Sequence, residues 1–512
     1  MNMVTVGVGP VSFDDVVAVA RDGAAVQLGA DAVDAVERAR EAVEKLAAAP
    51  TPSYGISTGF GALATRHIPT EMRAQLQRSL VRSHAAGSGP EVEREVVRAL
   101  MLLRLSTLAT GHTGIRLSTA QTMAALLSHG ITPIVHEYGS LGCSGDLAPL
   151  AHCALALMGE GEVRDREGVR RSAADALAEA GIEPVELAAK EGLALINGTD
   201  GMLGMLVLAI TDLRTLFKAA DVAAAMSVEA QLATDRVFAA DLQALRPHPG
   251  QAKSAANLTR ILADSGVVAS HRGPDCNRVQ DAYSLRCSPQ VHGAARDTAD
   301  HAATVATREL ASAVDNPVVL DDGRVESNGN FHGAPVGYVL DFLAIAAADV
   351  ASISERRTDR FLDKARSHGL PPFLADDPGV DSGHMIAQYT QAAIVSELKR
   401  LANPASVDSI PSSAMQEDHV SMGWSAARKL RRSLDGLTRV IAIEILTAAR
   451  ALDLRAPLEP APATAAVLQV LRERVAGPGP DRHLSPEIEA AVDLVHTGAI
   501  VAAVEDKIGP LQ

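Results

Sequence analysis

The sequence predicts an all-α, or mainly α, protein built as a bundle of long antiparallel helices. Apolar residues recur at spacings of three and four over long stretches, with charged residues between them, as in amphipathic helices. Hydrophobic residues make up 47% of the 512 residues and aromatic residues only 3%, so the core must consist mainly of Ala, Leu and Val. Long helices with small side chains need helical partners and pack closely, which favours a bundle.

The helical pattern is clearest in long stretches, which are 31–48, 203–231, 336–357, 385–402 and 425–454. Strand patterns are weak, with short candidates at 3–8 and 317–325. Gly- and Pro-rich breaks occur at 50–53, 246–250 and 273–274, a linker is expected at 456–463, and a turn at 477–480. We therefore expect an N-terminal domain over 1–200, a central long-helix bundle over 201–456 and a C-terminal helical tail over 457–512, which can also count as one continuous domain.

Composition excludes several classes of function. The net charge of −15 argues against a nucleic-acid partner, because phosphate binding needs clustered Lys and Arg. The N-terminus has no basic region followed by an apolar stretch, and no run of about eighteen apolar residues is evident, so we expect a cytoplasmic protein without a membrane partner. The 4 cysteines are too scattered for a disulfide framework, and no histidine spacing matches a metal site, so no metal is expected.

One loop, GSLGCSGDLAPLAH at 139–152, can build an electrophile from its own backbone. If the amide nitrogen of Gly145 attacks the carbonyl carbon of Cys143 and two waters are lost, an imidazolone ring forms with a methylidene group on the former Ser144. Gly145 has the conformational freedom that this approach needs, and Asp146 can assist the proton transfers. The simpler interpretation is a tight loop before a helix over 147–158, with Ser144 or Asp146 as its N-cap.

Read as a whole, this loop resembles the signature of the histidine and aromatic amino-acid ammonia-lyases, in which the tripeptide is usually Ala-Ser-Gly. Further blocks extend the resemblance over most of the chain: YGISTGFG (54–61), LVRSHAAGSG (80–89), KEGLALINGTDG (190–201), RVQDAYSLRCSPQVHGA (278–294), DNPVV (315–319), SNGNFHG (327–333), SERR (354–357) and SIPSSAMQEDHVSMG (409–423). Within the family, the blocks around His84 and Glu417 look like those of the histidine-acting members.

The resemblance implies a helix bundle of the aspartase/fumarase-like type, with a smaller N-terminal domain that carries the loop. It also implies a protein-derived 4-methylidene-imidazol-5-one (MIO) from Cys143-Ser144-Gly145, no external cofactor and no metal. The reaction must expel ammonia and remove a weakly acidic β-proton. Side chains cannot do both unaided, so such chemistry is usually assigned to a cofactor that acts as an electron sink. The family forms homotetramers whose active sites draw residues from more than one subunit.

The same resemblance gives roles to individual residues. Tyr54 looks like the base that removes the β-proton, and Tyr283 like the tyrosine beside the prosthetic group and the substrate amine. Arg286 can hold the substrate carboxylate through a two-pronged contact that lysine cannot reproduce. Asn197 resembles the residue that hydrogen-bonds this carboxylate. Whether Tyr54 or Glu417 takes the β-proton stays open.

Specificity for the substrate ring is expected to depend on His84 and Glu417. An imidazole needs an acceptor for its N–H and a polar partner at its other nitrogen, whereas a phenyl ring needs neither. Gln280 and Phe331 are weaker candidates for the pocket wall. The chain departs from the usual family pattern at a few positions: Cys143 for alanine, Asp200 where many relatives have glutamine, and Ala311 and Met415 for asparagines. These departures leave the ring-forming residues intact.

The resulting hypothesis is non-oxidative deamination of L-histidine to trans-urocanate and ammonia, the first step of histidine degradation. An alternative within the same chemistry is a tyrosine or phenylalanine ammonia-lyase or aminomutase, since some tyrosine-acting relatives also carry a histidine at the position of His84. Glu417 argues against that alternative. A helical scaffold protein without the chemistry is disfavoured by the intact tripeptide together with Tyr54, Tyr283 and Arg286.

Overall fold

The computed structural model describes residues 3–49, 55–59, 63, 65–142, 145–273, 276 and 279–512. Most of these residues are helical, so the predicted fold class is confirmed. The chain divides into two compact units, each assembled from segments that are distant in the sequence. The first unit is Met1–Ala209, Ala303–Asp341 and Pro404–Arg428, and the second is Ile210–Ala302, Phe342–Asn403 and Lys429–Gln512.

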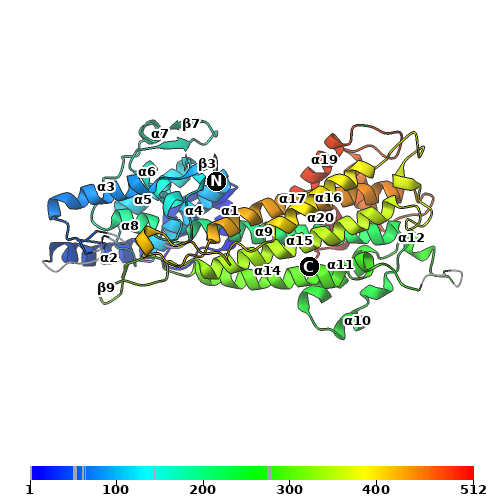
Figure 1. Cartoon of the computed structure of the whole chain (residues 1–512), viewed down its shortest axis with the longest axis horizontal. Coiled ribbons are helices and arrows are strands. Elements are labelled where there is room, and N and C mark those ends of the chain that lie inside the picture. Colours follow the sequence, from blue (N-terminus) through cyan, green and yellow to red (C-terminus); the bar gives the residue numbers. More distant parts are fainter. Residues whose placement is uncertain are drawn as a thin grey trace. The chain divides into compact units, whose positions relative to one another are not determined.

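The first unit contains the helices from α1 to α8 and all the strands described here (Figure 1). Its helices are α1 (Phe13–Ala20), α2 (Ala30–Ala48), α3 (Arg73–His84), α4 (Arg94–Ala109), α5 (Leu117–His129), α6 (Leu147–Leu157), α7 (Ala173–Ala180) and α8 (Glu191–Ile196), with 3-10 turns η2 (Thr70–Met72) and η5 (Ser413–Met415). Its strands are β1 (Met3–Val6), β2 (Ala25–Leu28), β3 (Ser88–Glu91), β4 (Thr132–Pro133), β5 (His136–Tyr138), β6 (Glu162–Arg164), β7 (Arg170–Ser172), β8 (Val318–Val319) and β9 (Val325–Glu326).

The strands form small sheets at the edges of the helices. β1 pairs with β2 in parallel, β3 with β5 and β8 with β9 antiparallel, and β4, β6 and β7 form an antiparallel sheet. The strand expected at 3–8 corresponds to β1, and the one expected around 317–325 to the β8–β9 hairpin. The other strands were not predicted, because strands of two to four residues carry too few positions for an alternating pattern.

α4 is the core helix of the first unit. Every residue from Val96 to Ala109 is buried, so this helix is enclosed on all sides rather than amphipathic. It packs against α1, α2, α5 and α6. Two of its buried residues are arginines, Arg98 and Arg104, and both have hydrogen-bond partners on other segments. Charged side chains in such a helix must have partners, because an unpaired buried charge is costly.

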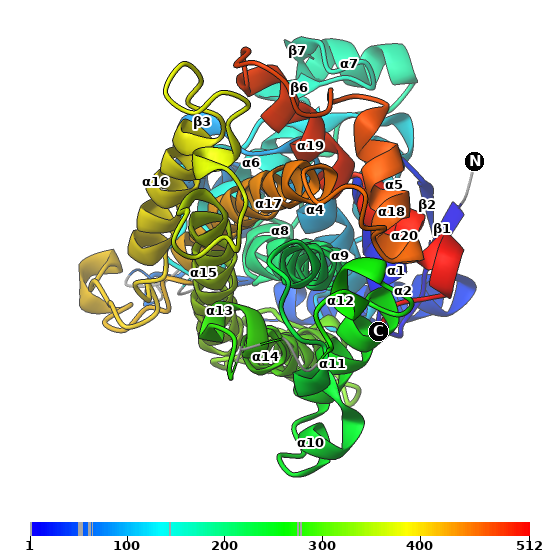
Figure 2. The same cartoon turned by 90° about the vertical axis from the view of Figure 1, so that its right-hand side faces the viewer.

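The second unit is the bundle of long helices (Figure 2). It contains α10 (Ala240–Ala244), α11 (Pro249–Ile261), α12 (Gly266–Ala269), α13 (Tyr283–Arg286), α16 (Met385–Leu401), α18 (Pro462–Arg472), α19 (Ser485–His496) and α20 (Ala499–Ile508), with 3-10 turns η3 (Arg236–Phe238) and η4 (Pro372–Leu374). The four longest helices contribute residues to both units: α9 (Asp200–Ala230), α14 (Ser288–Leu310), α15 (Ala334–Leu362) and α17 (Gly423–Asp453).

A buried ionic cluster joins the long helices inside the second unit. The carboxylate of Glu444 on α17 accepts hydrogen bonds from Ser227 on α9 (2.6 Å), from Ser354 on α15 (2.5 Å) and from the guanidinium of Arg357 on α15. Glu444 and Arg357 are fully buried. Since removing one partner of such a pair leaves an uncompensated charge, the cluster ties three helices to one register.

The boundaries of the predicted helices agree with α2, α9, α15, α16 and α17 to within a few residues. The sequential division at residues 200 and 456 stays a prediction. Two stretches, Glu191–Ala230 and Ala334–Leu362, are long and apolar enough to span a membrane by length and composition, with mean hydropathy of 1.7 and 1.8. Within the protein these apolar windows are 100% and 61% buried, and core helices pass the same test. α9 is therefore more apolar than the sequence pattern indicated.

Candidate active site

The loop that carries the predicted ring-forming residues lies in the first unit. Cys143 and Ser144 fall outside the described residues, but their neighbours on both sides are described. Gly145 has φ +81°, and a Cβ there would overlap the carbonyl oxygen of Gly198. Gly142 has φ +66°, and its carbonyl accepts hydrogen bonds from the Ser421 hydroxyl (2.7 Å) and from the amide of Gly333 (3.1 Å). Both positions thus need glycine.

Asp146 follows this loop and is fully buried. It occupies the N-cap position of α6, but its side chain makes no capping hydrogen bond to that helix. Instead its carboxylate accepts from the Ser140 hydroxyl (2.8 Å) and from the amides of Gly201 and Met202 (both 2.9 Å), at the first turn of α9. Burial, together with the charge of nearby Asp200, raises the pKa of Asp146 to about 7, although these hydrogen bonds lower it. At neutral pH this carboxyl group can both take and give a proton.

Asn197 is held in place through its backbone and its amide nitrogen. Its carbonyl accepts from Nη1 of Arg104 (2.7 Å), and its Nδ2 donates to the carbonyl of Asn316 (3.0 Å). Its Oδ1 is buried and has no hydrogen-bond partner among the described residues. Because an unpaired buried acceptor is costly, this oxygen is suited to a donor that is not part of the described chain.

His84 and Glu417, the predicted specificity residues, lie close enough in the first unit to interact electrostatically. Burial lowers the pKa of the half-buried His84, while the carbonyl of Leu80 and the charge of Glu417 raise it. Nδ1 of His84 is 2.9 Å from the Leu80 carbonyl, which can only accept, so Nε2 is left as an acceptor. Glu417 is half-buried and forms an isolated antiparallel bridge with Ser412, whose hydroxyl is 3.3 Å from Oε2.

Phe331 is half-buried on the loop before α15. The next residue, His332, stacks on His419 with 5.4 Å between ring centroids, and its Nε2 is 3.3 Å from the His419 carbonyl. The loop that carries Phe331 is therefore tied to the loop that carries Glu417.

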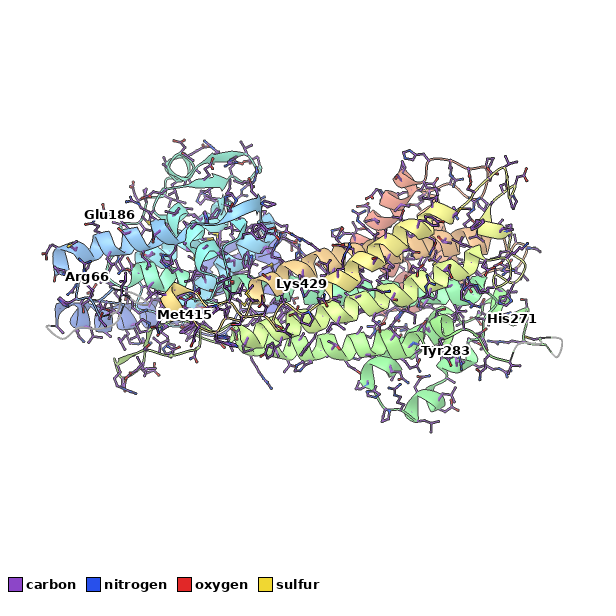
Figure 3. All side chains as sticks on the ribbon, in the orientation of Figure 1. Arg66, Glu186, His271, Tyr283, Met415 and Lys429 are labelled. Atoms are coloured by element: carbon purple, nitrogen blue, oxygen red, sulfur yellow. The ribbon has the colours of Figure 1, made fainter. Side chains whose placement is uncertain are left out.

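The remaining predicted residues gather in the second unit. Nη2 of Arg286 donates to Oε1 of Gln280 (2.9 Å), and the guanidinium carbon lies 4.8 Å from the centre of the Tyr283 ring. Nε of Arg286 is buried and has no hydrogen-bond partner among the described residues. Tyr283 is 72% exposed. Figure 3 labels its position in the second unit. Tyr54 lies outside the described residues. The other candidates fall into two sets, one in the first unit and one in the second unit.

Two buried ion pairs in the first unit were not predicted from the sequence. Lys190, at φ +72°, contacts Asp315 at 2.5 Å, and both side chains are almost fully buried. Arg104 and Asp200 form a second buried pair at 3.3 Å. A signal for the latter was present, because Arg104 is a cation within the apolar run ALMLLRL. Asp200 was noted as a departure from the family pattern, and the structure gives it this partner.

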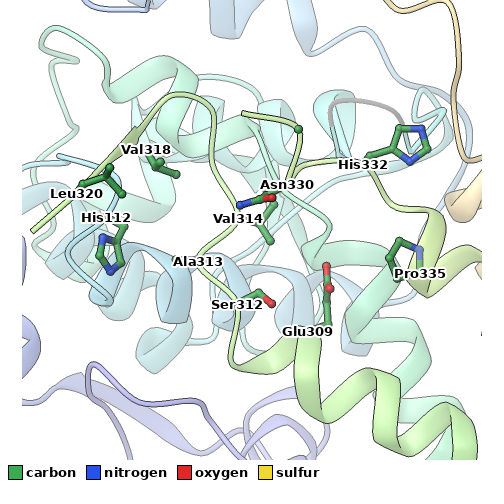
Figure 4. Close-up of a pocket in the computed structure, with 11 residues that line it drawn as sticks. His112, Glu309, Ser312, Ala313, Val314, Val318, Leu320, Asn330, His332 and Pro335 are labelled. Atoms are coloured by element: carbon green, nitrogen blue, oxygen red, sulfur yellow. The ribbon is translucent and has the colours of Figure 1, made fainter. Parts of the chain in front are cut away.

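A cavity of about 720 Å³ lies in the first unit (Figure 4). Its lining residues are His112, Glu309, Ser312, Ala313, Val314, Val318, Leu320, Gly329, Asn330, His332 and Pro335. Glu309 accepts a hydrogen bond from Thr199 (2.6 Å), and burial raises its pKa. None of the predicted substrate-binding residues lines this cavity. Among the described residues, no group of three or more His, Cys, Asp and Glu side chains is arranged to hold a metal ion.

Comparison with known proteins identifies the family. The sequence model of the family described as "Aromatic amino acid lyase" matches residues 11–473, and the chain belongs to this family. A histidine ammonia-lyase from Streptomyces griseus is 68% identical over the whole of both chains. One from Sorangium cellulosum is 50% identical over 98% of this chain and 99% of that one. The family inferred from the sequence motifs is thus confirmed.

Solved structures agree on the fold. A tyrosine aminomutase from Streptomyces globisporus superposes with a TM-score of 0.94 at 38% identity, covering 99% of this chain and 100% of that one. A histidine ammonia-lyase from Trypanosoma cruzi gives 0.91 at 38% identity, covering 99% and 95%. Since proteins named for different substrates match equally well, the fold by itself does not select the substrate.

Proposed function

We propose that this chain catalyses the non-oxidative deamination of L-histidine to trans-urocanate and ammonia, as the first step of histidine degradation. The structural observation that carries the choice of substrate is that His84 and Glu417 lie near enough in the first unit to interact electrostatically. A neutral imidazole acceptor beside a carboxylate matches the donor and acceptor nitrogens of an imidazole substrate. Full-length identity of 68% to a histidine ammonia-lyase supports the same substrate.

We further propose that Cys143, Ser144 and Gly145 form a methylidene-imidazolone. In the ring-forming step the Gly145 nitrogen bonds to the Cys143 carbonyl carbon and one water leaves; loss of the Ser144 hydroxyl with its α-hydrogen releases a second water. The described neighbours fit such a group. Gly145 is pressed against Gly198 where no side chain fits. Asp146, with a pKa of about 7, is positioned to assist the proton transfers.

The methylidene-imidazolone supplies an electrophile that accepts the substrate amine. The chain's own residues then bind and orient the substrate. Arg286, already oriented by Gln280 and Tyr283, holds the carboxylate through its guanidinium fork. Nδ2 of Asn197 donates one N–H to the carbonyl of Asn316, and its second N–H can donate to the same carboxylate. Phe331 forms part of the pocket wall. Tyr283 lies beside the amine.

Removal of the β-proton falls to Tyr54 or Glu417. Tyr54→Phe removes a proton acceptor and keeps the ring, whereas Glu417→Gln keeps the shape of the side chain and removes its basicity. The true base is the residue whose substitution eliminates exchange of the substrate β-hydrogen with deuterated solvent. The other substitution is expected to weaken binding more than exchange.

A tyrosine- or phenylalanine-acting lyase or aminomutase is the second candidate, because a tyrosine aminomutase superposes at a TM-score of 0.94. Incubation with L-histidine, L-tyrosine and L-phenylalanine, with identification of each product, separates the candidates. We expect urocanate and ammonia from L-histidine. A β-amino acid from L-tyrosine, or coumarate as the main product, would reverse the assignment.

Intact-mass measurement tests the prosthetic group independently of activity. The purified chain should be lighter than its translated mass by two waters, and Ser144→Ala should remove both the mass loss and the activity. A wild-type chain at full translated mass would contradict the proposed chemistry.

We also propose a cytoplasmic homotetramer with active sites shared between subunits. Arg286, Gln280 and Tyr283 belong to one unit and His84, Asn197 and Glu417 to the other. In the second unit, large apolar side chains are exposed on long helices, with Phe342 at 45% and Tyr389 at 61%. Such exposure favours association with other subunits. The buried thiol of Cys153 is compatible with a reducing compartment.

A further inference from the structure

We propose that Arg104 and Asp200 are positioning residues for formation of the prosthetic group, because together they hold Gly198 against Gly145. This inference rests on the proposed ring formation from Cys143, Ser144 and Gly145. It concerns the folded chain before cyclisation, not the bound substrate.

Gly198 is enclosed on two sides. On one side its carbonyl oxygen occupies the place that a Gly145 side chain would take, and it accepts the amide of Asp146 at 2.7 Å. On the other side a Cβ at Gly198 would overlap the Asp200 carboxylate and lie 2.7 Å from both Nη atoms of Arg104. The buried pair therefore forms the wall behind the segment that faces the ring-forming loop.

Arg104 fixes this wall to the core of the first unit. It projects from the enclosed helix α4, with a fully buried side chain. Its Nη1 donates to the carbonyl of Asn197 (2.7 Å), and its Nη2 donates to the carbonyl of Val314 (2.8 Å). A single guanidinium thus connects α4 to the residue before Gly198 and to the segment after α14.

Asp200 supplies the charge that keeps this guanidinium in place. Its Oδ2 lies 3.3 Å from Nε of Arg104, and its side chain is 5% exposed. The contact is an ion pair without hydrogen-bond alignment, since neither atom has a hydrogen-bond partner among the described residues. Loss of either residue alone leaves a buried charge without compensation, whereas loss of both does not.

The consequence for cyclisation follows from geometry. The Gly145 nitrogen must approach the Cys143 carbonyl carbon, and the hydrogen bond from Asp146 to Gly198 anchors the peptide immediately after Gly145. If Gly198 can move away from Gly145, the hydrogen bond from Asp146 moves with it. The loop then samples more conformations in which the Gly145 nitrogen and the Cys143 carbonyl carbon are apart. Intramolecular reactions lose rate steeply when the reacting atoms are misplaced.

The test follows two-water loss in the full-length chain after cell-free synthesis, by intact mass at successive times. A parallel protease-resistance assay gives the folded fraction, and the rate of mass loss is expressed per folded chain. The variants are Arg104→Met, Asp200→Leu, the double variant, and the milder Arg104→Lys and Asp200→Asn, which retain most of the side-chain volume in case the others do not fold.

The matched control is Arg98→Met. Arg98 is also a buried arginine of α4, but it donates to the carbonyls of Val19 (2.8 Å) and Leu127 (3.1 Å), away from the loop. We expect Arg98→Met to lower the folded fraction and to leave the cyclisation rate of folded chains unchanged.

We expect folded Arg104→Met and Arg104→Lys to cyclise about tenfold more slowly than wild type, or slower still. The double variant should recover folding relative to the single variants without recovering the cyclisation rate. Wild-type rates in folded Arg104→Lys and Asp200→Asn, or equal slowing in Arg98→Met, would overturn the positioning role while leaving the proposed function intact. Absence of two-water loss in the wild type would overturn both.

Discussion

At the scale of single residues, we predict that Glu417 sets the preference for an imidazole ring. A site that hydrogen-bonds a polar ring leaves its own buried groups unpaired when an apolar ring enters, and such mismatches discriminate by about four orders of magnitude. Glu417→Gln should therefore lose most activity on L-histidine and discriminate less against L-phenylalanine, with the two-water mass loss intact. Steady-state kinetics on both substrates, together with intact mass, measure this. Unchanged rate and discrimination would make Glu417 structural and reopen the tyrosine-acting alternative.

The loop before Glu417 contains local backbone strain. Ser413, Ala414 and Met415 have φ of +53°, +52° and +69°, a region that L-residues other than asparagine rarely occupy. Met415 stands where the resemblance to the family leads us to expect asparagine. Because Met415 is 67% exposed, its replacement removes little packing.

We expect Met415→Asn to stabilise the protein by up to about 1 kcal/mol, with substrate preference unchanged. The measurement is the urea midpoint of unfolding. Met415→Ala is the control, since alanine gains nothing in the left-handed region. Equal midpoints for the two variants would show that strain at this position does not limit stability.

Candidate residues could be named from the sequence, whereas the buried residues that support them could not. Gly145 was named because of the chemistry of ring formation, and Glu417 because of the resemblance to the family. Lys190 and Asp315 are 125 positions apart, and no local pattern pairs them. A buried cation and a solvated one look alike in sequence unless the flanking residues are strongly apolar, as around Arg104.

At the scale of elements, helices were predictable because a long amphipathic helix repeats its pattern many times. α16 and α17 were predicted within a few residues of their ends. Short strands such as β4 and β8, each of two residues, are too short to show an alternating pattern of polar and apolar residues. Their pairing depends on segments brought together by the helices, so tertiary contacts rather than local sequence determine them.

The start of α16 gives a prediction on pH dependence. His384 precedes this helix and is 2% exposed, with Nδ1 3.2 Å from the Thr447 hydroxyl. Burial and the charges of Arg450, Arg482 and Arg472 together lower its pKa to about 3, with Asp481 acting in the opposite direction. In the unfolded chain a histidine titrates near 6.5. Unfolding therefore takes up a proton below about pH 6.5, so stability falls as the pH drops from there toward 3.

For this histidine, the expected loss is about 1.4 kcal/mol per pH unit within that range. His384→Gln retains a hydrogen-bonding side chain without the titration, so its urea midpoint should decline less between pH 6.5 and pH 5. His496→Gln, at an exposed position on α19, serves as the control and should follow the wild type. If the urea midpoints of the wild type and of His384→Gln decline equally between pH 6.5 and pH 5, the prediction is wrong.

At the scale of the whole molecule, the division of the candidate residues between two units allows a test of the proposal that subunits share active sites. In the proposed mechanism, Ser144→Ala removes the ring-forming hydroxyl of the first unit, and Arg286→Lys weakens the carboxylate clamp of the second. If an active site combines the first unit of one subunit with the second unit of another, mixed oligomers of these variants contain some sites with both residues intact. Sites built within one chain never would.

Co-expression of the two variants with different affinity tags, followed by isolation of chains carrying both tags, tests this arrangement. With random pairing, we expect up to about one quarter of wild-type activity, far above either variant alone. Ser144→Ala co-expressed with Glu417→Gln is the control, because both residues belong to the first unit and their sites should not recover. If neither mixture regains activity, every site is complete within one chain, and oligomerisation has another role.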